Sequence, residues 1–587
     1  MTTFRIAPRF VAMLFCSWAV AAFADTRNAI ELLPPGMVAF AEIPKPYDVL
    51  SAVYDHQLAR RLESLDPVRA AMQKKKYLEF KAVVAVVESQ VGLPWRKIVE
   101  QATGGGLYIA KDASPTGAVI LARATDKTIH ANLLATLTNL ASQDAKGKGK
   151  SDPVKLQDYR GTKVYTVDKA RFAVVEDWLV ITNNDKLGEK IIDRVRDKAE
   201  KSLASDPQFA KAHRSVSAST IAWAYVNAAA LREAGVGKDL LNGKAKNPIA
   251  ELFFGGLLNA LNHTPYVTLA LESGDRDVRL SISAPYDRAW AKDSREYYFG
   301  PEGKGAAPPQ IFVDDTIVSV SSYRDVAGMW RGAGDLFDEQ MNEELAKADS
   351  GLTTLFGGKD FGEDILGAFR PETQVVVARQ RFAKGQPIPD IQLPAFAVVA
   401  EMKDPEKMRP ELRRTFQSLI GFANIVGAMN GQPQFDLDME KAGDTQFVTS
   451  SYLPDPKTKD TKVVKINYNF SPSIAFAGTR FVVASTNALA HSLVTASASE
   501  RPVGDADRVV NADAELRFDP LRDILKDNRG QLVAQNMLKE GHSKEEAERD
   551  VGVLLELIGW FDHVGLAVDT AQNELRVALD LVMKRID

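Results

Sequence analysis

Apolar and polar residues alternate in the same way near the end of each half of the chain. Residues 267–284 (VTLALESGDRDVRLSISA) and 564–581 (VGLAVDTAQNELRVALDL) align without a gap. Each alternates, turns over short polar residues and alternates again, which predicts a β-hairpin with one apolar face. Upstream of each hairpin, apolar residues recur at helical spacing, at 249–261 and 551–561, and residues 543–546 (SKEE) have the spacing of a capping box. Each half is expected to close with a helix and a hairpin.

The same succession of strand and helix occurs earlier in both halves. An apolar strand at 118–122 leads through Asp126 into a helix, and one at 396–400 leads through Asp404 into another. Aspartate is favoured at a helix N-cap, so this role is predicted for both residues. Two further pairs of segments match in the same order: 178–182 with 480–484, and 37–43 with 316–321. The common order predicts duplication of one unit, with chance similarity among strand–helix units as the alternative.

The mixture of strands and helices predicts an α+β fold, because hairpins require antiparallel pairing. Each half is expected to be a repeat, with a largely antiparallel twisted sheet and helices packed mainly on one face. A parallel α/β arrangement is the alternative. Residues 300–311 are rich in glycine and proline and poor in apolar residues, which predicts a linker. The predicted domains are a first repeat at 25–299 and a second repeat at 312–587.

Residues 1–24 have the features of a secretory signal peptide. Arg5 and Arg9 precede an apolar run at 10–23, which is shorter than the roughly 20 residues that a spanning helix needs. An uncleaved anchor is the alternative. Small residues flank Phe23, which predicts cleavage directly after them. The cleavage signal consists of Ala22, Ala24 and Asp25. We therefore expect an exported protein, either periplasmic or extracellular.

Composition narrows the possible chemistry. Cys16 is the one cysteine and lies inside the predicted leader, so the mature chain is expected to lack disulfides and thiol catalysis. Hydrophobic residues make up 45% and charged residues 26% of the sequence, which are ordinary values for a globular protein. The formal net charge of -4 supplies no strong field to attract nucleic acid. No other apolar run has spanning length, so no transmembrane segment is expected in the mature chain.

No motif of known catalytic or binding chemistry stands out. The 7 histidines lack the spacing of a zinc site, and no G-x-S-x-G elbow occurs. Residues 104–106 (GGG) precede a strand, so their amides are not set to cradle phosphate. One acidic cluster has Lys441 where a calcium loop needs glycine. The cluster consists of Asp436, Asp438, Glu440 and Asp444. We therefore predict no catalytic, cofactor-binding or metal-ligating residue, and no cofactor.

A succession of structural motifs carries a family resemblance. It runs through residues 159–165 (YRGTKVY), 172–184 and 202–209 (SLASDPQF), and residues 32–36 (LLPPG) open it. In these motifs the chain resembles the bacterial exported proteins grouped as Domain of Unknown Function 3352, over most of residues 30–285. The second half resembles them more faintly. The resemblance implies an envelope or extracellular address in a bacterium. It implies no catalytic residue, because the family has no established activity.

Three functions are compatible with these features. The first is a non-enzymatic binding or structural module of the bacterial envelope, whose partner is an unknown protein, an envelope polymer or an apolar ligand. Duplication produces a cleft between domains, which is a common place for ligands. The alternative is an envelope hydrolase whose carboxylates converge only in the folded structure. A third hypothesis is an assembly protein that uses its repeats as adhesive units.

Overall fold

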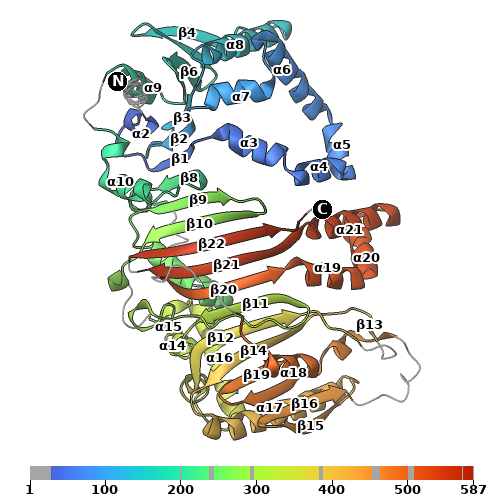
Figure 1. The fold of residues 1–587 in the computed structure, drawn as a ribbon. Helices are drawn as coiled ribbons and strands as arrows, with labels where there is room; N and C mark the ends of the chain where they lie inside the picture. Colours follow the sequence, from blue (N-terminus) through green and yellow to red (C-terminus); the bar gives the residue numbers. More distant parts are fainter. Residues whose placement is uncertain are drawn as a thin grey trace, which may run out of the picture. The chain divides into compact units, whose positions relative to one another are not determined.

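The computed structural model describes residues 28–197, 201–236, 244–290, 296–382, 388–452, 463–499, 508–571 and 573–585. The predicted signal peptide, residues 1–24, and its cleavage residues Ala22, Ala24 and Asp25 lie outside the described residues. The chain divides into two compact units, Met1–Ala234 (unit 1) and Gly235–Asp587 (unit 2), and Figure 1 labels most of their helices and strands. Within the described residues, no helix is both long and apolar enough to cross a bilayer.

The strands of unit 1 form one antiparallel sheet. Their order across the sheet is β4-β5-β6-β7-β3-β2-β1-β8, and each neighbouring pair is antiparallel. The strands are β1 (Ala39–Ile43), β2 (Leu107–Lys111), β3 (Ala118–Arg123), β4 (Val154–Tyr159), β5 (Thr162–Val167), β6 (Ala170–Val175), β7 (Trp178–Thr182) and β8 (Thr220–Val226). The predicted strands at 37–43, 118–122 and 178–182 therefore meet in one sheet, as β1, β3 and β7.

Two helices cover one face of this sheet, the covered face of unit 1, which carries Val119, Leu121 and Val180. Helix α9 lies against β6 and β7, and its Ile192 is buried there. Phe209 of α10 meets a ring of β1 edge-on, with centroids 5.2 Å apart. The unit 1 helices are α2 (Ala29–Leu32), α3 (Pro46–Tyr54), α4 (Gln57–Ser64), α5 (Asp66–Met72), α6 (Lys75–Val91), α7 (Trp95–Thr103), α8 (Ile129–Gly147), α9 (Asp185–Arg196), α10 (Pro207–Arg214) and α11 (Ala228–Glu233).

His130 near the start of α8 is buried, and we expect this to make the stability of unit 1 depend on pH. Its Nε2 lies 2.7 Å from the carbonyl oxygen of Ala102, and burial lowers the pKa of the imidazole below its usual value. The unfolded chain therefore takes up a proton near pH 6.5 that the folded chain resists. The stability that His130 contributes is present above that pH and is lost as the pH falls through the folded pKa.

We expect this loss to disappear in His130→Gln, which keeps an amide donor but does not titrate. Urea unfolding from pH 8 to pH 5 measures it. The wild-type chain should lose stability relative to the variant below about pH 6.5, by at most about 1.4 kcal/mol per pH unit. A difference between the two proteins that stays constant over this range would contradict the assignment.

The strands of unit 2 form a longer antiparallel sheet. Their order is β9-β10-β22-β21-β20-β11-β12-β14-β19-β18-β16-β15. The strands are β9 (Val267–Ser273), β10 (Asp277–Pro285), β11 (Thr316–Tyr323), β12 (Phe369–Ala378), β14 (Ala395–Met402), β15 (Phe435–Ala442), β16 (Thr445–Tyr452), β18 (Ser473–Ala477), β19 (Arg480–Ala484), β20 (Val509–Arg517), β21 (Phe561–Ala571) and β22 (Glu574–Met583). Two short strands, β13 (Ile388–Pro389) and β17 (Val463–Val464), pair in parallel beside it.

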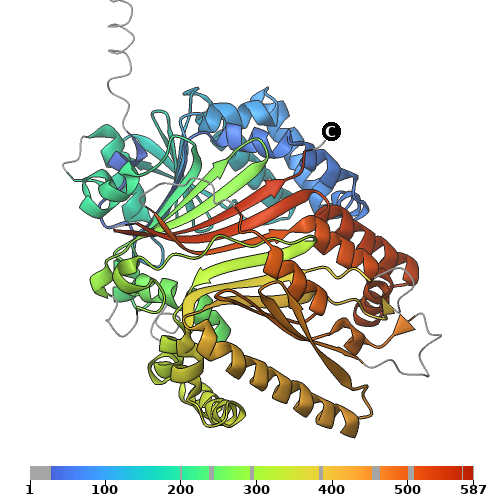
Figure 2. The same cartoon turned by 60° about the horizontal axis from the view of Figure 1, so that its bottom comes forward.

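Helices cover one face of the middle strands of unit 2 more fully than the other. Helix α18 packs over Val399 and Val482, which defines the covered face of unit 2. On the opposite face, α17 covers Ile474 and Phe476 at one end of the sheet, where Figure 2 shows it as the longest helix. The unit 2 helices are α13 (Pro248–Leu261), α14 (Val326–Arg331), α15 (Ala333–Leu336), α16 (Glu339–Leu355), α17 (Pro405–Met429), α18 (Asn487–Thr495), α19 (Phe518–Asp527), α20 (Arg529–Glu540) and α21 (Lys544–Ile558). The predicted α+β class is confirmed.

Part of the unit 2 sheet has the same strand order as the unit 1 sheet. Reading β11, β12, β14, β15, β16, β18, β19 and β20 as counterparts of β1 to β8 in chain order, each neighbour pair of the unit 1 sheet recurs in unit 2. Chance similarity of local strand–helix units does not explain a common long-range pairing order. The duplication stays a prediction, and this order favours it.

The two hairpins with aligned sequences lie next to each other in the unit 2 sheet. Strands β10 and β22 pair antiparallel with Ser281 opposite Ala578. These two residues occupy the same position in the gapless alignment of 267–284 with 564–581. A pairing centred on equivalent residues relates the hairpins by a local two-fold axis, as in the contact between two identical subunits.

The pairing of β10 with β22 explains why the boundary between the compact units does not fall in segment 300–311, which is rich in glycine and proline. Because β10 pairs with β22, the first hairpin is part of unit 2. Segment 300–311 itself lies against the sheet: Ala307 N donates to Val510 O at 2.9 Å, and Ile311 is buried. The repeat boundaries at 299 and 312 stay predictions about ancestry.

Most of the predicted helix starts are found. Asp404 caps α17 by accepting from Lys407 N, and residues 543–546 form the expected capping box before α21. The N-cap role of Asp126 is wrong. Its Oδ1 accepts from Thr128 N at 2.8 Å in a tight turn, and Thr128 is the N-cap of α8.

Candidate functional site

An unbroken row of apolar side chains crosses the sheet of unit 1, with one residue from each strand. Each member lies directly opposite the next in the pairing register, so all of them point to the same face. In sheet order the unit 1 row is Leu156, Tyr165, Phe172, Ile181, Ile120, Ile109, Ala41 and Ala224. We call the face that carries it the open face.

None of the residues of the unit 1 row is buried. Ile109 is 47% exposed and Ile120 is 36% exposed, whereas Leu121, the next residue along β3, is 1% exposed on the covered face. Single exposed apolar residues are normal on a protein surface, but a contiguous apolar patch is typical of a binding surface. The open face of unit 1 is therefore the first part of the candidate site.

Unit 2 carries a longer row of the same kind. Its members are again directly opposite one another in the register, in the order Met439, Val448, Ile474, Val483, Val398, Val375, Val320, Ala514, Leu566, Leu579, Leu280 and Leu271. Only Val448 and Ile474, beside α17, are buried among these residues, and Val398 is 41% exposed. Val375, Val398 and Val483 are the counterparts of Ile109, Ile120 and Ile181 in unit 1.

A cavity of about 260 Å³ opens on the unit 2 row. Val398 and Val483 line it from the open face of the sheet, and α14 and the start of β12 close its other sides. Its remaining apolar walls are Val326, Ala327, Leu366, Phe369, Pro371, Ala400 and Phe481. Arg324, Asp325 and Arg370 bring charge to this otherwise apolar pocket.

The unit 1 row also borders a cavity. It has a volume of about 650 Å³, lies between α8 and strands β5 and β6, and includes Tyr165 of the row in its wall. Ala131 and Leu134 face it from the helix, Lys163 and Arg196 bring positive charge, and Glu176 brings negative charge. Ligand sites usually have apolar walls with few polar groups, which describes the unit 2 cavity, whereas polar and charged residues make up much of the wall of the unit 1 cavity.

Arg324, one of the pocket residues, is 4% exposed and has only neutral hydrogen-bond acceptors. Its Nε donates to Leu252 O at 2.7 Å, and its Nη1 donates to Tyr323 O at 2.6 Å and to Tyr298 O at 3.2 Å. Nη1 also donates to the side-chain oxygen of Asn511. Burial lowers the pKa of the Arg324 guanidinium to about 10, so it carries its charge at neutral pH.

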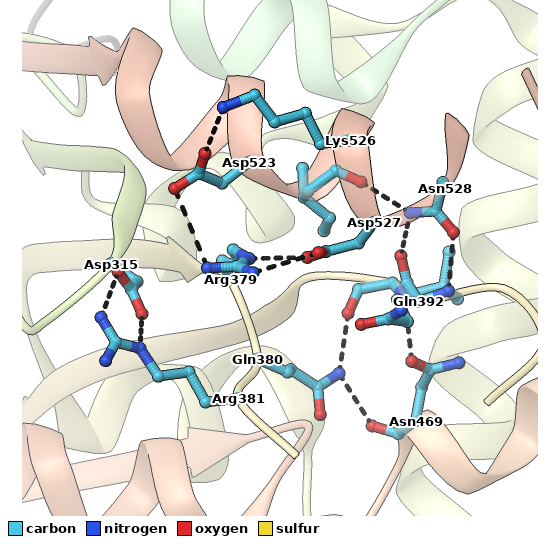
Figure 3. A network of polar contacts seen from close by, with 12 residues as sticks. Asp315, Arg379, Gln380, Arg381, Gln392, Asn469, Asp523, Lys526, Asp527 and Asn528 are labelled. Carbon is cyan, nitrogen blue, oxygen red and sulfur yellow. Dashed lines mark hydrogen bonds and ion pairs between the residues drawn. The ribbon is translucent and has the colours of Figure 1, made fainter. Parts of the chain in front are cut away.

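A network of ion pairs joins α19 to the ends of β11 and β12 (Figure 3). Arg379 donates from Nε to Asp527 Oδ2 at 2.7 Å and from Nη2 to Asp527 Oδ1 at 3.1 Å. Arg381 holds Asp315 with two hydrogen bonds, and these lower the pKa of the Asp315 carboxyl. Each arginine has its carboxylate, so this network fixes α19 against the sheet and leaves no charge for a ligand.

Side-chain amides in Figure 3 extend this network of polar contacts around α19. Asn528, which follows α19, accepts from Gln392 N and donates to Gln392 O, both at 2.8 Å. Asn469 accepts from Leu393 N at 2.9 Å and donates to Ile391 O at 2.8 Å. These amides replace strand pairing for the segment before β14 and have a structural role.

The residues considered for metal binding do not converge. No group of three or more histidine, cysteine, aspartate or glutamate side chains among the described residues is placed to hold a metal ion. Asp436, Asp438 and Glu440 lie on the exposed strand β15. His213 pairs instead with the carboxylate of Glu42, with Nε2 and Oε1 3.0 Å apart.

Five carboxyl groups among the described residues have a displaced pKa. Among the described residues, those with a displaced pKa all have it lowered, because hydrogen bonds stabilise the charged form. They are Asp126, Asp193, Glu302, Asp315 and Glu546. A general acid in a hydrolase usually has a raised pKa.

The open-face rows were missed from the sequence, although a signal for them exists. Residues 118–122 (AVILA) and 396–400 (FAVVA) are apolar at both odd and even positions. Such runs predict a strand with two apolar faces, not one. The helices of each unit cover mainly one face of its sheet, and the sequence does not show which strand residues lie on that face.

Comparison with known proteins confirms the family resemblance. The model of the family described as Protein of unknown function (DUF3352) matches residues 111–255. Crystal forms III and I of TP0453 are each 14% identical, cover 46% of this chain and 82% of that chain, and give a TM-score of 0.25. Crystal form IV is 12% identical, covers 44% and 81%, and also gives a TM-score of 0.25. No curated protein matches the chain.

Proposed function

We propose that this protein is a non-enzymatic binding module of the bacterial envelope that holds lipid acyl chains on its open faces. The observation that carries the proposal is the unbroken apolar row in each unit, whose residues are all at least partly exposed except Val448 and Ile474 beside α17. An apolar surface left in water costs about 25 cal/mol per Å², so an uncovered row of this length calls for a ligand. Export to the envelope, as the leader predicts, would bring the protein to lipids.

The direction of the rows favours a chain-like ligand. Neighbouring strands lie about 4.8 Å apart, so each row is a narrow apolar track that runs across the strands. An extended peptide would pair with the edge of a sheet along a strand and would not cross it. An acyl chain has no hydrogen bonds to satisfy and gains about 0.8 kcal/mol for each methylene that it buries.

A hydrolase remains the alternative, and it has less support. The carboxyl groups of the described residues that have a displaced pKa all have it lowered, whereas a general acid usually has a raised pKa. Carrier function needs only the apolar faces and the cavities beside them. Adhesive assembly through the rows would instead make the protein self-associate as its concentration rises.

The proposal is tested with an uncharged reporter, pyrene-decanol, titrated into the mature chain. Ile120→Asp and Val398→Asp each place a carboxylate on one row, where the chain would have to desolvate it. We expect each single variant to lose about half of the saturable binding and the double variant to lose nearly all of it. Leu538→Asp is the matched control, because Leu538 is exposed and apolar but lies on α20, outside both rows.

The Leu538→Asp control distinguishes a specific binding site from nonspecific binding to exposed apolar residues. If Leu538→Asp weakens binding as much as the row variants, the reporter binds to any exposed apolar residue and the proposal is wrong. It is equally wrong if the wild-type chain shows no saturable binding.

A further inference from the structure

The unit 2 cavity carries a free positive charge beside its apolar walls. Arg370, at the start of β12, is exposed and lines the cavity. It has no hydrogen-bond or ion-pair partner among the described residues, unlike Arg379 and Arg381 on the same segment, which hold carboxylates. An unpaired guanidinium beside an apolar pocket is a ready partner for an anion.

The other charged residues of the cavity do not cancel this charge. Asp325 accepts from Gly328 N at 2.9 Å and caps α14, so its carboxylate is already engaged. The buried guanidinium of Arg324 bonds only to neutral oxygens. Two arginines and one aspartate leave an excess of one positive charge at the cavity.

We propose that this cavity binds the carboxylate head of a long-chain fatty acid, with Arg370 as its ion-pair partner and the chain lying on Val398 and Val483. This inference rests on the proposed function, because it assigns a head group to the chain that the open face holds. A guanidinium matches a carboxylate with two parallel hydrogen bonds, which gives the head a fixed orientation.

The size of the cavity suits the first part of such a ligand. An apolar cavity of about 150 Å³ binds benzene. The volume of about 260 Å³ therefore has room for the head and several carbons. The rest of the chain leaves along the row, where Val398 and Val483 are both partly exposed and directly opposite each other.

The experiment compares hexadecanoate with hexadecanol as competitors of pyrene-decanol on the full mature chain at pH 8. The two competitors share a chain and differ only in the charge of the head. We expect the wild-type chain to bind hexadecanoate about tenfold more tightly. Arg370→Gln should remove this preference and leave hexadecanol binding unchanged, whereas Arg370→Lys should keep part of it.

Arg413→Gln is the matched control, because Arg413 is exposed on α17, away from the cavity. It should leave the preference intact. Equal binding of both competitors to the wild-type chain would overturn this inference and leave the proposed function standing. Failure of every apolar probe to bind would overturn the proposed function first. Capture of the chain by vesicles of anionic phospholipid, dependent on Arg370 and without binding of monomeric hexadecanoate, would replace the fatty acid by a membrane surface and overturn the inference.

Discussion

Replacing Arg324 with methionine is expected to lower the free energy of unfolding by about 3 kcal/mol. The guanidinium joins α13, the segment around Tyr298, the end of β11 and Asn511 of β20. Methionine fills similar space but donates nothing, so Leu252 O, Tyr323 O and the Asn511 side-chain oxygen each lose a donor at once, whereas Tyr298 O keeps the donor of Asn511 Nδ2. An unsatisfied buried acceptor costs about 1–3 kcal/mol, which outweighs the gain from removing a buried charge.

Urea unfolding at pH 7 measures this effect, with Arg413→Met as the control on the surface. We expect the control to change stability by less than about 0.5 kcal/mol. Arg324→Lys should fall between wild type and methionine, because one ammonium cannot reach acceptors on so many sides. If the Arg324→Met chain is as stable as wild type, these oxygens find other donors. The stabilising role assigned to the hydrogen bonds of Arg324 would then be wrong.

Local pattern predicted the elements of this fold well. The alternation at 267–284 and 564–581 became two hairpins, and the helix starts at Asp404 and 543–546 are where the cap residues place them. Asp126 failed because an aspartate two residues before a helix competes with the cap for the same turn. These are short-range effects, which a single sequence carries.

The candidate site depends on long-range pairing, which a single sequence does not carry. Ile109 and Ile120 lie on strands that are neighbours both in the sequence and in the sheet. Ile181 lies in the same row only because β7 pairs with β3. The antiparallel pairing of β10 with β22 brings together segments about three hundred residues apart in the sequence. Arg324 is equally hidden, because nothing in the sequence links it to Leu252 or Asn511. The common order of strand and helix segments in the two halves indicated a similar topology, but it did not predict which strands pair.

The common topology also gives the site its physical meaning. If one ancestral unit was copied, its open face was copied with it, and both copies have kept apolar residues at the same strand positions. Solvent-facing positions of a sheet usually become polar, because the fold does not need apolar residues there. An apolar row on both sheets therefore supports the proposed ligand, which would be a constraint other than folding.

The second large effect follows from the contrast between the two faces of one strand. Leu121→Asn is expected to lower the free energy of unfolding by about 4 kcal/mol, since it removes buried methyl groups and buries an amide under α9 and its neighbours. Ile120→Asn, one residue away on the open face, should cost less than about 1 kcal/mol. The exposed fractions of 1% and 36% give the reason for this difference.

Unit 2 offers the same comparison independently. Val399 is 4% exposed beneath α18, and Val398 is 41% exposed on the row. Val399→Asn should be strongly destabilising and Val398→Asn nearly neutral, both followed by urea unfolding. The two open-face variants should nonetheless lose pyrene-decanol binding. A residue that matters for binding and not for folding belongs to a site, whereas equal losses of stability from both faces would show that the rows are ordinary core and would remove the basis for a lipid ligand.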